Sequence, residues 1–228
     1  MLYAKHFRRR VQQLVKHYRE TGKVSFTQKT RKEALMPSTL RTSGVRYERE
    51  YALSAVHVDL FYHNQRWVVA VLDDHSRMVL AAKECEQRSV EASVAVLNEA
   101  YERYKHIRRI GYVITDHGAE FYASKRDKNG IARHRFEEFC RSKGIKHVLC
   151  KYNPPQSNGK IEKWVHTYKR FREEFSSLEE FLNWYNHIRP HMSLDWRKLE
   201  TPAERFYASL QPFILGKFMS WPEKEVPT

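Results

Sequence analysis

The order of short apolar runs between residues 54 and 150 constrains the fold more than any other feature. Three strand-like runs follow one another closely, separated by turn-type sequences, and predict an antiparallel meander. Two later strand-like runs alternate with segments whose apolar residues recur at helical spacing. Strands are expected at residues 54–62, 66–72, 77–84, 111–115 and 145–150, and helices at residues 90–104, 133–143, 159–174 and 178–188. The pattern predicts a mixed α/β domain.

The 228 residues allow one such domain with appendages. Residues 1–20 carry three consecutive arginines and apolar residues at helical spacing, so a basic helix followed by a basic linker is expected up to residue 45. We expect the core to cover residues 46–210 and a C-terminal tail to cover residues 211–228.

The charge balance favours a polyanionic partner. Lys and Arg total 41 against 27 Asp and Glu, a net charge of +14 with a pI near 9.7. Nucleic acid is the leading candidate, while a basic ribosome-associated or membrane-surface protein remains an alternative. No apolar run is long enough for a membrane span or a signal peptide, and the three cysteines show no disulfide or zinc spacing, so a cytoplasmic location is expected.

Three acids stand out, each with an ordinary alternative. Asp59 lies in the middle of an apolar strand, where it is either a functional carboxylate or an acid on a solvated edge. Asp116 ends a buried strand and is followed by Gly118, which suits a ligand site or a simple turn. Glu162 lies near the start of a helix and outside its apolar stripe, where the helix dipole alone would favour an acid.

Four stretches, taken together, carry a family resemblance: "VHVDLF", "VITDHGAEF", "NPPQSNGKIEKW" and "WYNHIRPHMSL" followed by "TPAERF". The chain resembles, over about residues 45–207, the catalytic core of the DDE recombinases, which include retroviral-type integrases and prokaryotic insertion-sequence transposases. The resemblance implies a ribonuclease H-like α/β fold with a mixed five-stranded sheet flanked by helices. It also implies that Asp59, Asp116 and Glu162 are the catalytic acids and bind two Mg²⁺ or Mn²⁺ ions.

Three departures from the family pattern are visible. His117 follows the second acid, where the family often has Asn, and the interval from Asp116 to Glu162 is longer than usual. The extra length falls in the polar segment 125–130, where an insertion is tolerated. The N-terminal region is short for the helix-turn-helix domain of such transposases, so a truncated version is expected. A His-His-Cys-Cys zinc module is excluded because the first 50 residues contain no cysteine.

The resemblance implies a DNA transposase that cleaves and transfers strands of a mobile element. The alternatives are a ribonuclease H-like nuclease without strand transfer and a non-catalytic DNA-binding remnant of a transposase. Expected partners are the element's ends, target DNA and further copies of the chain, in a prokaryotic cytoplasm and at the nucleoid when DNA is bound. The expected DNA-binding residues are Gln156, Asn158, Lys160, Lys163, Lys169 and Arg170.

Other polar residues near these acids have more ordinary interpretations. The pair Asp73 and Asp74 is expected to form the turn between two strands. Glu120 is expected to flank the site, and His57 shares a strand face with Asp59, so it is expected to pack beside the site.

Overall fold

The computed structural model describes residues 49–125, 127–129, 133–150 and 159–219, with side chains up to residue 213 in the last range. The chain divides between residues 47 and 48, close to the expected boundary at residue 45. The expected N-terminal helix and linker therefore lie outside the described residues, as do Gln156 and Asn158.

A mixed sheet with the strand order β3-β2-β1-β4-β5 forms the centre of the domain. Its strands are β1 (Ala55–His63), β2 (Arg66–Asp73), β3 (Val79–Cys85), β4 (Tyr112–Thr115) and β5 (Lys146–Leu149). The first three strands form the predicted antiparallel meander, and β4 and β5 add to β1 in parallel. The mixed five-stranded sheet expected from the sequence is confirmed.

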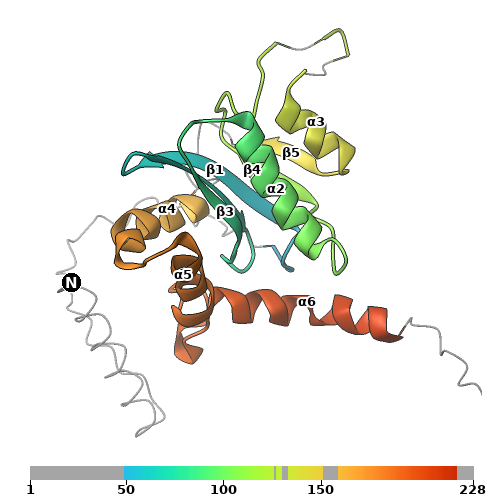
Figure 1. Ribbon diagram of the computed structural model, residues 1–228. Coiled ribbons are helices and arrows are strands. Elements are labelled where there is room, and N and C mark those ends of the chain that lie inside the picture. Colours follow the sequence, from blue (N-terminus) through green and yellow to red (C-terminus); the bar gives the residue numbers. More distant parts are fainter. Residues whose placement is uncertain (1–48, 126, 130–132, 151–158, 220–228) are drawn as a thin grey trace, which may run out of the picture. The chain divides into compact units, whose positions relative to one another are not determined.

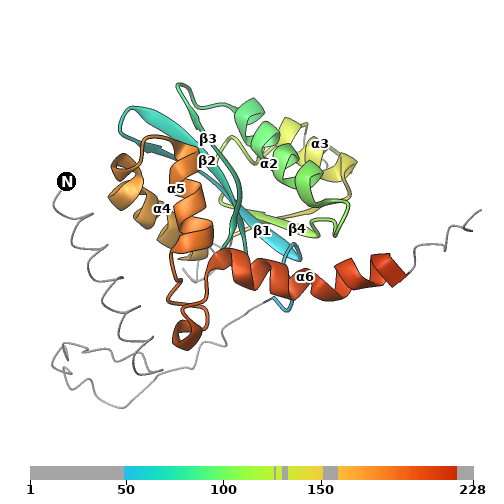
Figure 2. The same ribbon diagram turned by 60° about the horizontal axis from the view of Figure 1, so that its bottom comes forward.

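Helices cover both faces of this sheet, as Figure 2 shows most clearly, with α2 and α3 on one side and α4 and α5 on the other. The helical elements are α2 (Val90–Tyr104), α3 (Arg135–Ser142), α4 (Gly159–Phe171), the 3-10 turn η2 (Arg172–Glu174), α5 (Leu178–Asn183), the π-helical turn η3 (Trp184–Ile188), the 3-10 turn η4 (Trp196–Lys198) and α6 (Pro202–Met219). In chain order, α2 and α3 alternate with β4 and β5, and the remaining helical elements follow β5 (Figure 1).

Strand β2 explains why the sheet needs covering on both sides. Its residues alternate between two separate cores, because successive side chains of a strand point to opposite faces. Val69 and Val71 pack with α2, α3 and α6, whereas Val68, Ala70 and Leu72 pack with α4 and α5. Both alternating sets of apolar side chains in β2 are therefore buried.

The helix boundaries differ from the expected ones in two places. The helix expected over residues 159–174 ends at Phe171 and continues as the single turn η2. Helix α6 runs through the expected boundary at residue 210 to Met219, so the first part of the expected tail is helical and includes Pro212. No helix in the described ranges has the length and apolar character that crossing a membrane requires.

Candidate active site

Asp59 lies on the face of the sheet that α4 covers. It pairs with Ala70 across the antiparallel ladder of β1 and β2, and directly opposed residues point to the same face. Ala70 packs with Ile161 and Trp164 of α4. The carboxylate of Asp59 is half-buried, and its Oδ1 accepts a hydrogen bond of 2.9 Å from the backbone N–H of Leu60.

Asp116 follows the last residue of β4 and comes beside Asp59 because β1 and β4 are parallel. Their ladder pairs His57 with Ile114, and the same register continued by two residues aligns Asp59 with Asp116. Neighbouring strands lie about 4.8 Å apart, so the two side chains project from adjacent backbone positions. The Oδ1 of Asp116, an exposed residue, accepts a hydrogen bond of 2.9 Å from the N–H of Gly118.

Gly118 makes room for two carboxylates. A Cβ at this position would lie 2.6 Å from Oε1 of Glu120 and 2.9 Å from Oδ1 of Asp116. Real Cβ atoms do not approach other atoms so closely, so a side chain here would displace one of the acids. Glycine is required here by this close approach and not by backbone conformation, since the φ of Gly118 is not in the left-handed region.

Glu162 reaches the site from the first turn of α4. The buried stripe of this helix, which includes Ile161, Trp164 and Tyr168, packs against β2 and sets the helix's rotation. Glu162 falls outside the stripe and is exposed at its border, as expected from the sequence.

The shifted pKa of Asp59 reflects the other acids that lie near it. Burial raises the pKa of Asp59, the negative charge of Asp116 raises it further, and Glu162 and Glu120 add to the effect, so that the pKa reaches about 6 despite the hydrogen bond from Leu60. Three carboxylates, from the segment after β4 and from α4, therefore lie near enough to act on Asp59 of β1. Within the described ranges, no three His, Cys, Asp or Glu side chains lie close enough together to enclose a metal ion.

Glu120 is more closely associated with the acidic site than its expected flanking position suggested. Only 5% of the residue is exposed, and its Oε2 accepts hydrogen bonds from Nε of Arg88 at 3.0 Å and from Nη2 of the same guanidinium. Arg88, which lies just before α2, thus neutralises and orients a carboxylate beside Asp116. The sequence signal was the glycine two residues before Glu120; nothing local indicated Arg88.

Residues 52–155 match the family described as the integrase core domain. Somewhat under half of the chain is therefore similar to an integrase core. The match includes Asp59 and Asp116 and all five strands, whereas Glu162 lies beyond it.

The chain has relatives among viral and archaeal proteins. It is 27% identical over 147 residues to the "Putative integrase ORF3" of Spiroplasma virus SpV1-C74, an alignment that covers 58% of this chain and 40% of the viral protein. An uncharacterised protein of Archaeoglobus fulgidus is 29% identical over 101 residues, covering 44% of this chain and 73% of that protein. The chain therefore spans less than half the length of the viral relative.

Solved structures agree with the fold. The catalytic core domain of BIV integrase superimposes with a TM-score of 0.54 at 18% identity, covering 72% of this chain and 98% of that one. A chain of the simian T-cell lymphotropic virus intasome gives a TM-score of 0.53 at 15% identity, covering 80% and 60% of the two chains. The described domain thus has the ribonuclease H-like fold of retroviral integrase catalytic cores.

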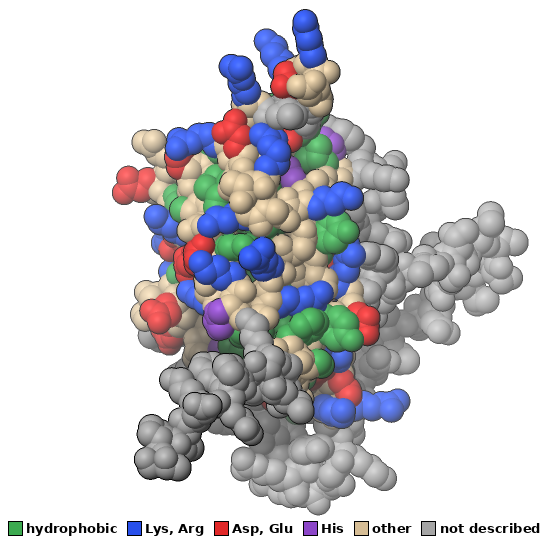
Figure 3. Space-filling model, turned by 90° about the vertical axis from the view of Figure 1, so that its right-hand side faces the viewer, with side chains coloured by type: hydrophobic (Ala, Val, Ile, Leu, Met, Phe, Trp, Pro, Cys, Tyr) green, Lys and Arg blue, Asp and Glu red, His purple; other side chains and the backbone are tan. Residues whose placement is uncertain are grey.

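The basic residues expected to bind DNA are not equivalent in the structure. Lys163, Lys169 and Arg170 are exposed on α4, with Lys169 Nζ 5.7 Å from the ring centre of Phe61. Lys160 instead donates hydrogen bonds to the side chain and backbone of Asp74. Elsewhere on the described domain, Lys and Arg side chains are scattered among fewer acidic ones over the face shown in Figure 3.

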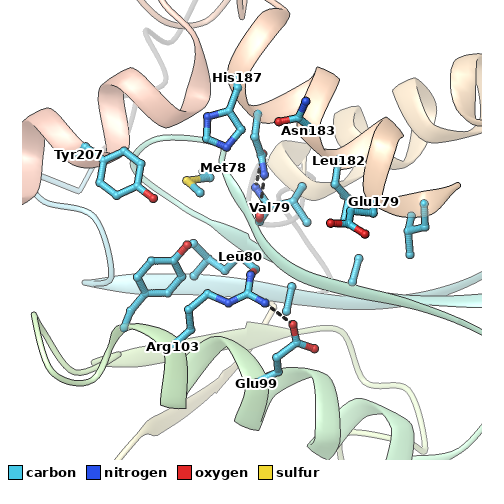
Figure 4. Close-up of a pocket in the computed structure, with 15 residues that line it drawn as sticks. Met78, Val79, Leu80, Glu99, Arg103, Glu179, Leu182, Asn183, His187 and Tyr207 are labelled. Carbon is cyan, nitrogen blue, oxygen red and sulfur yellow. Dashed lines mark hydrogen bonds and ion pairs between the residues drawn. The ribbon is translucent and has the colours of Figure 1, made fainter. Parts of the chain in front are cut away.

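A groove of about 620 Å³ opens on the outer edge of the sheet, away from the acids. Figure 4 shows it between β3, α2 and the segment from α5 to η3, with Arg103 and Glu99 forming an ion pair at one side. None of Asp59, Asp116 and Glu162 lines it. The groove is therefore a separate feature from the acidic site.

Proposed function

We propose that this protein is a DNA transposase or integrase of the DDE type, which cleaves DNA strands and joins them to new positions. The observation that carries the proposal is that the charges of Asp116 and Glu162 act on Asp59, although the three acids come from separate elements; Asp59 and Asp116 lie within the stretch that matches an integrase core. Acids gathered from distant parts of the chain, and costly to keep ionised together, are typical of a functional site.

The acids of this site suit divalent cations. Asp59, Asp116 and Glu162 would hold two Mg²⁺ or Mn²⁺ ions, since hard cations prefer carboxylate oxygens. The raised pKa of Asp59 supports this assignment, because a nearby cation would offset the repulsion that now opposes its ionisation. When bound, such ions activate an oxygen nucleophile and neutralise charge at the phosphorus.

The protein's own contribution is to place the carboxylates. Backbone N–H groups of Leu60 and Gly118 each hold one oxygen of Asp59 and Asp116, which leaves the other oxygen of each directed elsewhere. The half-buried position of Asp59 lowers the local dielectric and strengthens charge interactions with a bound phosphate. Exposed Lys163, Lys169 and Arg170 on α4 would contact the DNA backbone, as would Gln156 and Asn158.

Two successive in-line displacements account for transposition. Water first attacks the phosphorus at the element's end, and the bond to the 3′-oxygen breaks to release a 3′-hydroxyl. That hydroxyl then attacks a phosphorus of target DNA, forming the new bond as the target's own 3′-oxygen leaves. Each step forms one P–O bond and breaks another: the first leaves a 5′-phosphate and a 3′-hydroxyl, and the second exchanges one phosphodiester bond for another. Joining two ends requires two or more copies of the chain.

The test is a strand-joining assay with oligonucleotides that carry the DNA ends flanking the protein's own coding region, in Mg²⁺ or Mn²⁺. Wild type should nick and join them, and Glu162→Gln should lose both reactions by at least about a hundredfold, the effect of removing one strong transition-state contact. Glu174→Gln, an exposed glutamate of η2, is the matched control and should keep activity.

Three other results would each contradict the proposed function. Nicking without joining would favour a ribonuclease H-like nuclease. DNA binding without either reaction would favour a non-catalytic remnant. Full activity of Glu162→Gln would show that the acids assigned here do not perform the reaction.

A further inference from the structure

A second carboxylate network lies beside the acidic site and connects two of its elements. Asp74, at the turn after β2, is 4% exposed and uses its two carboxylate oxygens in different directions. Its Oδ1 lies 2.7 Å from Nε2 of His57 on β1, and its Oδ2 accepts a hydrogen bond of 2.7 Å from Nζ of Lys160 on α4. The backbone carbonyl of Asp74 accepts a further bond of 3.1 Å from the same ammonium group.

These partners stand next to the proposed catalytic acids in the chain. His57 is two residues before Asp59 on the same face of β1, and Lys160 is two residues before Glu162 in the first turn of α4. Asp74 thereby ties the strand that carries one acid to the helix that carries another. We infer that Lys160 and Asp74 are positioning residues, which hold the first turn of α4 so that Glu162 faces Asp59.

The network is strong enough to act in this way. Burial opposes ionisation of Asp74, but hydrogen bonds and charge from His57 and Lys160 outweigh it and lower its pKa to about 2. Charge-assisted hydrogen bonds are directional, whereas the apolar packing of α4 on β2 is not. The ion pair is therefore suited to set the position of the helix end along the sheet.

The far end of α4 has a matching anchor on the same side of the sheet. Glu84 of β3 accepts hydrogen bonds of 2.6 Å from the hydroxyl of Tyr168 and 2.7 Å from Nε of Arg172. A buried carboxylate at Asp74 and a partly buried one at Glu84 thus hold α4 at its two ends. The anchor at Asp74 is the one next to Glu162, so its loss should affect the acidic site first.

This inference rests on the proposed function but differs from the expectation that Lys160 contacts DNA. Hydrogen exchange and metal binding, both measured on the full chain, distinguish a positioning role of Lys160 from a DNA contact. In Lys160→Met, the amides of residues 163–166, which bond to carbonyls of the first turn, should exchange at least about tenfold faster, as expected when a partly buried ion pair is broken. Amides of β1 and β2 should be unaffected.

Two further variants complete the test. Lys160→Arg keeps a cation of similar reach and should restore slow exchange, whereas Asp74→Asn should resemble Lys160→Met. Lys163→Met, an exposed lysine of the same turn region, is the control and should leave exchange at wild-type rates. Titration with Mn²⁺, followed by electron paramagnetic resonance, should show about tenfold weaker binding by Lys160→Met and recovery in Lys160→Arg.

The outcomes are distinguishable from those of the proposed function. Unchanged exchange in Lys160→Met, or no recovery in Lys160→Arg, would overturn the positioning role, whatever the activity. A wild type that binds no Mn²⁺ and joins no DNA would overturn the proposed function, and exchange alone would then decide the role of Lys160. Weaker DNA binding by Lys160→Met with wild-type exchange would restore the DNA-contact assignment and overturn this one.

Discussion

At the scale of single residues, the ionised carboxylate of Asp59 lowers the stability of the folded domain. Asp59 has a folded-state pKa of about 6, above the ordinary value near 3.8 that it has in an unfolded chain. Between these values the folded state binds more protons, so the contribution of Asp59 to stability falls as the pH rises from about 4 to 6. The penalty is complete above the folded-state pKa.

Replacing this acid should therefore stabilise the metal-free protein in a pH-dependent way. Asp59→Asn should raise the free energy of unfolding by about 1–3 kcal/mol at pH 8, since one pKa unit corresponds to about 1.4 kcal/mol, and by little at pH 4. Urea unfolding at both pH values measures the difference. Mn²⁺ should stabilise wild type more than the variant. If Asp59→Asn raised the free energy of unfolding equally at pH 4 and pH 8, this explanation would be contradicted.

Gly118 gives a second prediction at the residue scale. In Gly118→Ala the new Cβ must displace the carboxylate of Glu120 or Asp116, so strand joining should fall by at least about tenfold while the domain stays folded. Gly159→Ala is the matched control, because its Cβ would meet no atom within 4 Å and alanine suits a helix better. A Gly118→Ala protein with full activity would show that the close approach is unimportant.

At the scale of elements, side chains from neighbouring helical segments form hydrogen bonds with backbone groups of the edge strand β3. Asn186 of η3 accepts a hydrogen bond of 2.9 Å from the N–H of Val79 and donates one of 2.9 Å to its carbonyl, as an adjacent strand would. Arg103 of α2 donates to the carbonyl of Leu80 at 3.1 Å. These bonds occupy edge groups of β3 that could otherwise pair with another chain.

The buried Asn186 should therefore matter for stability but not directly for chemistry. Asn186→Ala leaves a buried N–H and a buried C=O without these partners, so the free energy of unfolding should fall by about 2–4 kcal/mol. Chemical denaturation measures the loss, and light scattering should show more self-association. Asn183→Ala, an exposed asparagine three residues earlier, should change stability by less than about 0.5 kcal/mol. Equal effects of the two changes would refute the edge-closing role.

At the scale of the whole molecule, the net charge of +14 should govern DNA affinity. Binding that releases counterions weakens linearly on a plot of log affinity against log salt, with a slope set by the number of phosphates contacted. Lys163→Ala should reduce the slope by about one and weaken binding to all sequences alike. Lys198→Ala, which removes an exposed lysine paired with Asp195, is the control, and fluorescence anisotropy over a salt series measures both. An unchanged slope in Lys163→Ala would remove it from the DNA interface.

The sequence by itself determined the order of strands and helices and pointed to three acids. The apolar runs of β1 and β2 and the helical stripe of α4 are local patterns, so they could be interpreted without tertiary contacts. The motif around Asp116 was equally local. The residues that follow Phe171 and Leu210 departed from expectation because helix ends depend on packing as well as on propensity.

Only the tertiary structure decided which side chains meet. The parallel register of β1 and β4 brings Asp116 beside Asp59, and no local pattern specifies that register. Likewise, Arg88 reaches Glu120 and Lys160 reaches Asp74 across long intervals of sequence. Asp74 reads as a turn residue in the sequence, yet in the folded chain it is a buried anchor, because burial and ion pairing are properties of the assembled layers.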